Sequence, residues 1–258
     1  MTQANFPAIM DKVFEYEVGP DWRTGGLVDH PKDPGGLTRW GIASRSHPGV
    51  DIRNLTKAGA LKIYERDYWK PCAGPDLPIG LDLVAMDGSV NSGVKRGVKW
   101  LQRGLKVKAD GVAGPQTIAA AKAAPVHTAI KAATAARMGF LQGLRTFSTF
   151  GRGWSRRVAD VEATAIAMTS ATIPKLVREV LVVESRTANT TAKAQNQATA
   201  APAAAGGGVA FTDLPTPALI ALVALLGLAA FILWRKASHN RERAKAYQRA
   251  AERIGVNT

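Results

Sequence analysis

The feature that most constrains this chain is an uncharged run near its C-terminus. Residues 214–234, LPTPALIALVALLGLAAFILW, contain no charged side chain over 21 residues. At about 1.5 Å per residue, a helix of this length reaches roughly 30 Å, the thickness of a hydrocarbon core. We therefore predict one transmembrane helix here. The alternative is a buried core helix in a soluble protein.

The segment that follows this run is basic. Residues 235–258 carry seven Arg or Lys and two Glu, a net charge of +5, whereas the flank before the run offers only Asp213. Because basic flanks stay in the cytoplasm, we predict a single-pass helix in a bacterial inner membrane, with residues 235–258 as a cytoplasmic tail. The N-terminal region then lies in the periplasm, although residues 1–17 match no conventional signal peptide.

The composition changes along the chain, and these changes predict its domains. Residues 173–213 are rich in Ala, Thr, Gln, Pro and Gly, so we predict a flexible linker. Residues 1–172 show helical periodicity, with room for a small hairpin in 25–43, which predicts a mainly α fold. We divide this part into domains 1–93 and 94–172. Thr56 is a predicted helix N-cap, and Pro115 a predicted first-turn residue.

The formal net charge of +14 indicates a polyanionic partner. Nucleic acid, anionic lipid and cell-wall polymer all satisfy this condition, but the basic residues are not interleaved with a nucleic-acid reading helix, so we expect no nucleic-acid partner. The single cysteine, Cys72, excludes an intramolecular disulfide, and the four histidines lack metal-ligand spacing. We expect neither a metal nor a cofactor.

The first predicted helix carries a candidate acid. Glu17 is the next residue due on its apolar face, and a carboxyl group there should be partly desolvated, which raises its pKa. Such a group suits general acid catalysis near neutral pH. Alternatively the helix ends at Glu17, because Gly19 and Pro20 follow, and the side chain points into solvent. The apolar face consists of Phe6, Ile9, Met10, Val13 and Phe14.

The loop after this helix, DHPKDPGGLTRWGI (29–42), supplies further polar groups. A loop this rich in Pro, Gly and ionisable residues is either a solvated turn or a built site. Glycoside cleavage uses an acid and a second carboxylate that flank the bond. Asp29 and Asp33 are the candidates for that second carboxylate.

Three separated strings resemble the glycoside hydrolase 108 lysozymes of phages and prophages. They are GGLVDHPKDPGGLTRWGI (25–42), IYERDYW (63–69) and DGSVNSG (87–93). Two later strings, DGVAGPQTIAA (110–120) and FGRGWSRRV (150–158), are similar to the peptidoglycan-binding domain that follows in this family. The resemblance implies a lysozyme-like helical domain and N-acetylmuramidase activity.

One departure from the family pattern affects the catalytic residue. In family members the catalytic Glu opens an E-G-G-Y motif, whereas here VGPDWRT (18–24) separates Glu17 from Gly25, and Leu27 takes the aromatic position. Either the insertion is a loop that leaves Glu17 in place, which we favour, or the acid is lost, because Thr24 would align without a gap.

The resemblance and the residue types together assign the site. We predict Glu17 as general acid, Asp33 as the carboxylate that activates water or stabilises the oxocarbenium-like centre, and Thr38 as the residue that positions the water. Asp33 can instead form an Asx turn and Thr38 a cap. Substrate-binding candidates are Asp29, Trp40 as a sugar platform, and Asp87 with Asn91, which share a helical face and alternatively support the loop backbone.

These predictions converge on an endolysin-like N-acetylmuramidase that cleaves the β-1,4 bond between N-acetylmuramic acid and N-acetylglucosamine for wall degradation or host lysis. The alternatives are a lytic transglycosylase and an inactive, membrane-tethered wall-binding protein. The expected partners are peptidoglycan, the inner membrane through residues 214–234, and a holin where the N-terminal domain must pass a membrane lesion.

Overall fold

The computed structural model describes residues 5–29, 35–169, 174–205 and 216–256. Helices dominate these residues, so the predicted mainly α fold is confirmed. Packing separates two compact units, residues 1–137 and 138–258.

The first unit begins with α1 (Phe6–Glu17), whose predicted apolar face is buried. A 3₁₀ turn, η2 (Gly19–Asp21), follows, and then the two-stranded hairpin of β1 (Thr38–Arg39) and β2 (Ile42–Ala43), which lies within the predicted range. Thr38 pairs with Ala43 and Arg39 with Ile42. The ring of Phe14 packs 5.2 Å from Trp40 and 5.5 Å from Tyr64, which joins α1, the hairpin and the next helix into one core.

The remaining elements of the first unit are helical. Thr56 caps α2 (Lys57–Tyr64) as predicted, because its hydroxyl accepts from the Gly59 N–H at 3.1 Å. The chain continues through a π-helical turn, η3 (Glu65–Trp69), and a 3₁₀ turn, η4 (Gly74–Asp76). It then forms α3 (Leu81–Ser92), α4 (Val94–Gly104), α5 (Pro115–Ala123), which starts at Pro115 as predicted, and α6 (Val126–Gly143), which ends in the second unit.

Helices α3 and α4 pack closely across the predicted domain boundary at residue 93. A β-carbon on Gly97 would lie 2.6 Å from the Ser89 nitrogen, so only glycine allows this approach. The boundary at residue 93 is therefore not a break in packing, and the first unit continues to Arg137.

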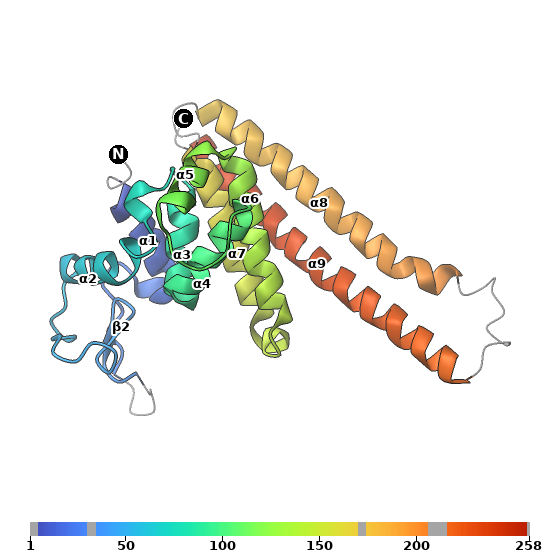
Figure 1. Cartoon of the computed structure of the whole chain (residues 1–258), viewed down its shortest axis with the longest axis horizontal. Helices are drawn as coiled ribbons and strands as arrows, with labels where there is room; N and C mark the ends of the chain where they lie inside the picture. The colour runs from blue at the N-terminus through green and yellow to red at the C-terminus, as the bar shows by residue number, and fades with distance from the viewer. Residues whose placement is uncertain (1–4, 30–34, 170–173, 206–215, 257–258) are drawn as a thin grey trace. The chain divides into compact units, whose positions relative to one another are not determined.

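The second unit contains α7 (Phe147–Thr169), α8 (Pro174–Ala205) and α9 (Thr216–Val256). Figure 1 shows α8 and α9 side by side and antiparallel. Their contact includes the Ser185 hydroxyl, which donates to the Ala244 carbonyl at 2.9 Å, and the Asn240 amide, which donates to Gln195 at 2.9 Å. Residues 174–205, which we predicted as part of a flexible linker, form helix α8 in the structure, because the Ala-rich sequence favours helix and α9 provides a packing partner.

Helix α9 is long and apolar enough to cross a membrane, the one such helix in the described part of the chain. Its apolar side chains from Ile220 to Trp234 are largely exposed. Its basic half behaves differently: Ala237, Ala244 and Tyr247 are buried against the rest of the second unit.

Residues 235–256, which we predicted as part of a separate tail, continue α9 in the structure. Glu162 of α7, 2% exposed, accepts from Arg243 at 2.6 Å and from the Tyr247 hydroxyl at 2.5 Å. These contacts hold the basic half of α9 against α7 within the second unit. The predicted orientation, with a periplasmic domain and a cytoplasmic tail, stays a prediction.

Candidate active site

Glu17 is the last residue of α1, and its side chain is exposed. The helix ends here because Val18 closes the last turn, its N–H donating to the Phe14 carbonyl at 2.9 Å, and Gly19 then takes a positive φ of 79°. The partial desolvation expected from the apolar face is therefore not observed, and the alternative, in which the helix ends at Glu17 and the side chain is exposed, is the one that the structure shows.

The seven inserted residues fold into a compact loop that returns to the end of α1. The Thr24 N–H donates to the Asp21 carbonyl at 3.0 Å, and the Gly25 N–H donates to the Trp22 carbonyl at 3.3 Å. Gly26 has no room for a β-carbon beside the Val18 side chain. The two ends of the loop therefore meet, and the paired glycines lie next to the helix end that carries Glu17.

The turn of the hairpin lies on another side of Glu17. A β-carbon on Gly41 would lie 3.1 Å from the Cβ of Glu17 and 2.7 Å from the Tyr64 hydroxyl. Tyr64 donates to the Trp40 carbonyl at 3.0 Å and so holds this turn in place. The hairpin is thus fixed beside the candidate acid.

Trp40 is a core residue, so its predicted role as a sugar platform is wrong. Its side chain is 4% exposed, and its Nε1–H donates to the Leu55 carbonyl at 3.0 Å. Its ring packs against Gly25, where a β-carbon would lie 2.6 Å away. Trp40 also adopts a positive φ of 55°, which is uncommon for a residue other than glycine.

The other loop candidates differ in their surroundings. The Thr38 hydroxyl donates to the Gly36 carbonyl at 3.1 Å, a local turn contact that leaves its lone pairs available to a water. Asp29 is exposed and forms an ion pair with Arg53 at 3.1 Å. Asp33 lies outside the described residues.

Asp87 and Asn91 do not form a sugar-binding face. Asp87 has no exposed surface and accepts from Arg137 of α6 at 2.5 Å. Asn91 accepts from the same guanidinium at 2.9 Å, and Arg137 is itself 3% exposed. The alternative structural role is the one that the geometry favours, because the pair ties α3 to α6.

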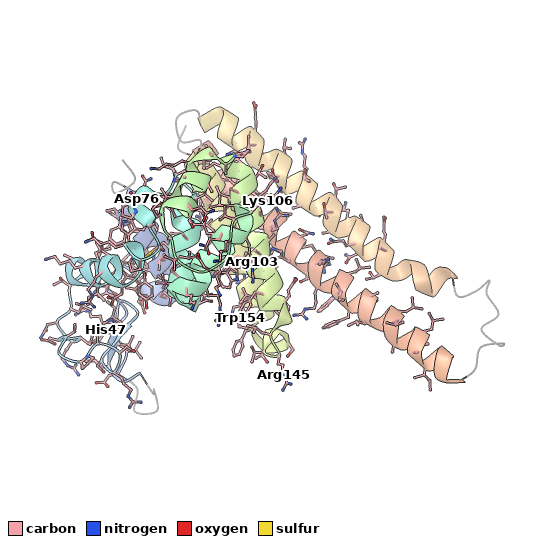
Figure 2. All side chains as sticks on the ribbon, in the orientation of Figure 1. His47, Asp76, Arg103, Lys106, Arg145 and Trp154 are labelled. Carbon is pink, nitrogen blue, oxygen red and sulfur yellow. The ribbon has the colours of Figure 1, made fainter. Side chains whose placement is uncertain are left out.

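A further polar group near Glu17, Tyr68, lies outside the site residues assigned from the sequence. Tyr68 of the π-helical turn is half-buried, and burial together with the charges of Asp67 and Glu17 raises its pKa. Asp67 accepts from Arg66 at 2.5 Å and lies 3.2 Å from His47 (labelled in Figure 2). The Arg66 hydrogen bond, followed by that of His47, lowers the pKa of Asp67. π-Helical turns occur often at functional sites, but the local sequence contains no signal that predicts such a turn.

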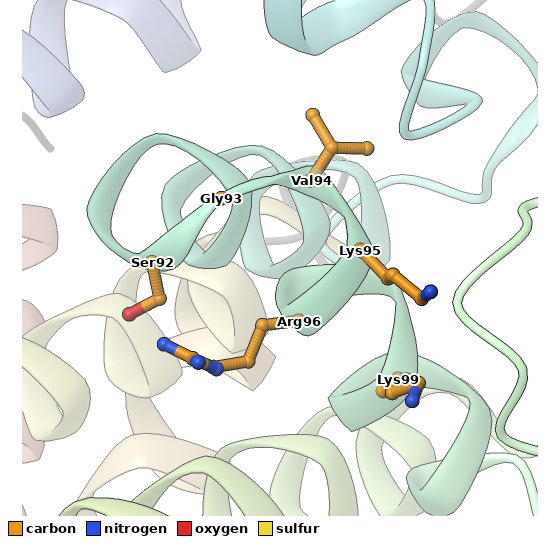
Figure 3. Close-up of a pocket in the computed structure, with 6 residues that line it drawn as sticks. All are labelled: Ser92, Gly93, Val94, Lys95, Arg96 and Lys99. Carbon is orange, nitrogen blue, oxygen red and sulfur yellow. The ribbon is translucent and has the colours of Figure 1, made fainter.

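A cavity of about 360 Å³ at the α3–α4 junction presents positive charge. Figure 3 shows the Arg96 guanidinium turned toward Ser92, whereas Lys95 and Lys99 lie on the side away from Ser92. Gly93 makes the junction with a positive φ of 84°. The cavity suits an anionic group. No cluster of three or more His, Cys, Asp or Glu able to hold a metal ion occurs among the residues with described positions.

Two protein families and one solved structure are similar to this chain. The family described as glycosyl hydrolase 108 matches residues 22–93, and the one described as a predicted peptidoglycan domain matches residues 96–159. The structure of SagA from Brucella abortus is 40% identical, with a TM-score of 0.55, and the alignment covers 65% of this chain and 97% of that chain. This chain belongs to the glycosyl hydrolase 108 family. No curated protein matches it.

Membership of the glycosyl hydrolase 108 family supports a lysozyme-like glycoside hydrolase activity, and the second domain supports peptidoglycan as partner. The glycosyl hydrolase 108 match begins at Trp22, so Glu17 precedes it. The cationic cavity lies where the first match ends and the second begins.

Proposed function

We propose that this chain is an endolysin-like N-acetylmuramidase. It hydrolyses the β-1,4 bond between N-acetylmuramic acid and N-acetylglucosamine, with Glu17 as general acid. Residues 1–93 act as the muramidase domain and residues 94–172 as the peptidoglycan-binding domain. The cationic cavity at Lys95, Arg96 and Lys99 is suited to the carboxylates of the peptide stems.

One observation carries this proposal: the insertion after Glu17 closes on itself. Because Gly26 packs against Val18, the paired glycines that follow the family's catalytic Glu in sequence lie beside Glu17 in space. The hairpin turn at Gly41 is also adjacent to this side chain. A saccharide bound over this turn would exclude water from Glu17, which favours a carboxyl group that donates its proton.

The second catalytic group comes from the loop that ends at β1. We propose Asp33 for this role, with Thr38 placing the attacking water. Asp29 is the weaker candidate, because its carboxylate is paired with Arg53. Tyr68, beside Glu17, supplies a hydroxyl for the saccharide or the leaving oxygen.

The test is a pair of matched substitutions on α1. Glu17→Gln should reduce hydrolysis of purified peptidoglycan by at least about 10²-fold, the usual contribution of a general acid. Glu15→Gln is the control, because Glu15 is exposed on the same helix and pairs with Lys12 at 2.9 Å. Full activity of Glu17→Gln with unchanged wall binding would contradict the acid assignment.

A lytic transglycosylase would use the same Glu without an attacking water. The products distinguish the two reactions, because hydrolysis leaves a reducing end and transglycosylation leaves an anhydro end. Under our proposal, mass spectrometry of the digested glycan shows reducing ends. A wild-type chain that binds the wall without cutting it would instead support the inactive wall-binding alternative.

We further propose that α8 and α9 enter a bacterial inner membrane as a hairpin from one face. The sequence between Lys193 and Arg235 has one charged residue, Asp213, and the basic half of α9 stays with α7. Basic residues at the exit indicate the cytoplasmic face. Access to the wall then requires a lesion of the holin type, as in phage or prophage lysis. Protease digestion of spheroplasts tests this arrangement: cleavage of the N-terminal domain before lysis would contradict it.

A further inference from the structure

A second cavity, of about 700 Å³, lies within the second unit where the uncharged half of α9 ends. Its walls come from the end of α6, the first turns of α7 and the middle of α9. Figure 2 shows Arg145 at the turn between α6 and α7, with Trp154 nearby on α7. This cavity is separate from the candidate active site in the first unit.

The lining of this cavity combines positive charge with aromatic rings. Glu242, the acidic residue that lines it, lies 3.6 Å from Lys245. Neither Arg145 nor Arg152 has an ion-pair partner within the described ranges, so both charges face solvent or a ligand. The charged and aromatic lining residues are Arg145, Arg152, Arg235, Phe147, Phe231 and Trp234.

Arg235 is held in place on the floor of this cavity. Its guanidinium lies 4.0 Å from the centre of the Phe147 ring and 5.2 Å from that of Phe231. It also donates to the Gln142 carbonyl. Its Nε is buried without a hydrogen-bond partner in the described structure. An arginine oriented by two rings is pre-organised to bind an oxyanion.

The cavity lies at the level where α9 would leave the hydrocarbon. Exposed apolar side chains lead up to it on one side, with Leu228 55% exposed, Phe231 50% and Trp234 54%. Charged residues begin at Arg235 on the other side. Tryptophan and arginine at such a transition are typical of the interface between lipid and water.

We propose that this cavity binds the headgroup of an anionic phospholipid. The phosphate interacts with Arg145, Arg152 and Arg235, and the acyl chains lie along the exposed apolar face of α9. A stem-peptide carboxylate satisfies the charge but leaves Phe231 and Trp234 uncovered, so the lipid is the ligand that fits the whole lining. The inference rests on the proposed membrane association of α9, and it places α7 at the membrane surface.

The test uses the full-length chain in mild detergent, titrated with phosphatidylglycerol or phosphatidylcholine and followed by native mass spectrometry. The wild type should retain phosphatidylglycerol preferentially. Arg145→Gln with Arg152→Gln should weaken its retention about 25-fold, since each interfacial basic residue contributes about fivefold. The control, Arg103→Gln with Arg156→Gln, removes two exposed arginines outside the cavity and should change retention by less than about threefold.

Several outcomes would overturn the proposal. Equal losses in the two double variants would show diffuse attraction in place of a site, and displacement of the lipid by inorganic phosphate would show a free-anion site. A second measurement does not depend on the arginine variants: brominated phosphatidylglycerol should quench the fluorescence that Trp234→Phe removes, and brominated phosphatidylcholine should quench it less. Failure of the chain to float with any vesicles would refute the membrane association itself, irrespective of its activity on peptidoglycan.

Discussion

Replacement of Asp87 by Asn should strongly destabilise the first unit. The carboxylate is fully buried and lies 2.5 Å from the guanidinium of Arg137, which is itself 3% exposed and 5.6 Å from the Trp100 ring. Asn keeps the size and one acceptor of the side chain but removes its charge. The substitution therefore leaves a buried guanidinium without its anionic partner, and Asn91 and the new amide offer it neutral oxygens alone as side-chain acceptors in the described structure.

The expected cost is about 3–5 kcal/mol, the usual result when one partner of a buried ion pair is removed. A difference of this size makes opening of α3 and α6 roughly 10²- to 10⁴-fold more frequent. Replacement of both partners, Asp87→Leu with Arg137→Met, should recover most of the loss, because no charge then remains buried.

Amide hydrogen exchange on the full-length chain measures how often α3 and α6 open. The control is Asp29→Asn, which breaks the exposed pair with Arg53 and should cost no more than about 1 kcal/mol. Exchange in Asp87→Asn within a few-fold of the wild type would refute the structural role. A raised KM for peptidoglycan at unchanged stability would restore the substrate-binding role that the sequence suggested.

Two further predictions concern buried residues of the first unit. Burial raises the pKa of Asp82 from 3.8 to about 6. The folded state therefore binds more protons than the unfolded state between these pH values. The free energy of unfolding should fall by about 3 kcal/mol as the pH rises from about 4 to 6, and it should stay level above pH 6. Urea unfolding across this range should show that slope, and Asp82→Asn should flatten it; a slope that persists in the variant contradicts the assignment. Trp40→Ala should cost about 3–5 kcal/mol as a loss of core packing, while KM for glycan fragments stays unchanged below the melting temperature; a raised KM in the folded variant would indicate sugar contact instead.

The local parts of the fold were predictable from the sequence. Helical periodicity predicted α1 and its buried face, and the hydroxyl of Thr56 and the ring of Pro115 marked helix starts through their own chemistry. These features depend on residues close together in the chain. The end of α1 at Glu17 was the alternative that Gly19 and Pro20 indicated, and it is the one observed.

The features that the sequence analysis missed depend on distant partners. Trp40 is buried because Gly25 and Phe14 accept its ring, and neither contact is visible in the loop alone. Helix α8 contains few large hydrophobic residues, yet the positions that are buried or that face α9 are spaced alternately four and three residues apart, as in a coiled coil. This spacing could have predicted that α8 packs against another helix. The positions are 181, 185, 188, 192 and 195 in α8 and 237, 240, 244, 247 and 251 in α9. Because the helices are antiparallel, Ser185 meets Ala244 and Gln195 meets Asn240.

The insertion after Glu17 leaves the end of α1 and the paired glycines in contact, although seven residues separate Glu17 from Gly25 in the sequence. Closing a loop of seven residues costs little chain entropy, and each doubling of its length would add only about 0.6 kcal/mol. The cost is small here because Gly19, Gly25 and Gly26 adopt the positive φ angles that bring the chain back to Val18. The relevant unit is therefore the contact between the helix end and the paired glycines. An ungapped comparison assigns the acid position to Thr24, whereas our proposal assigns it to Glu17.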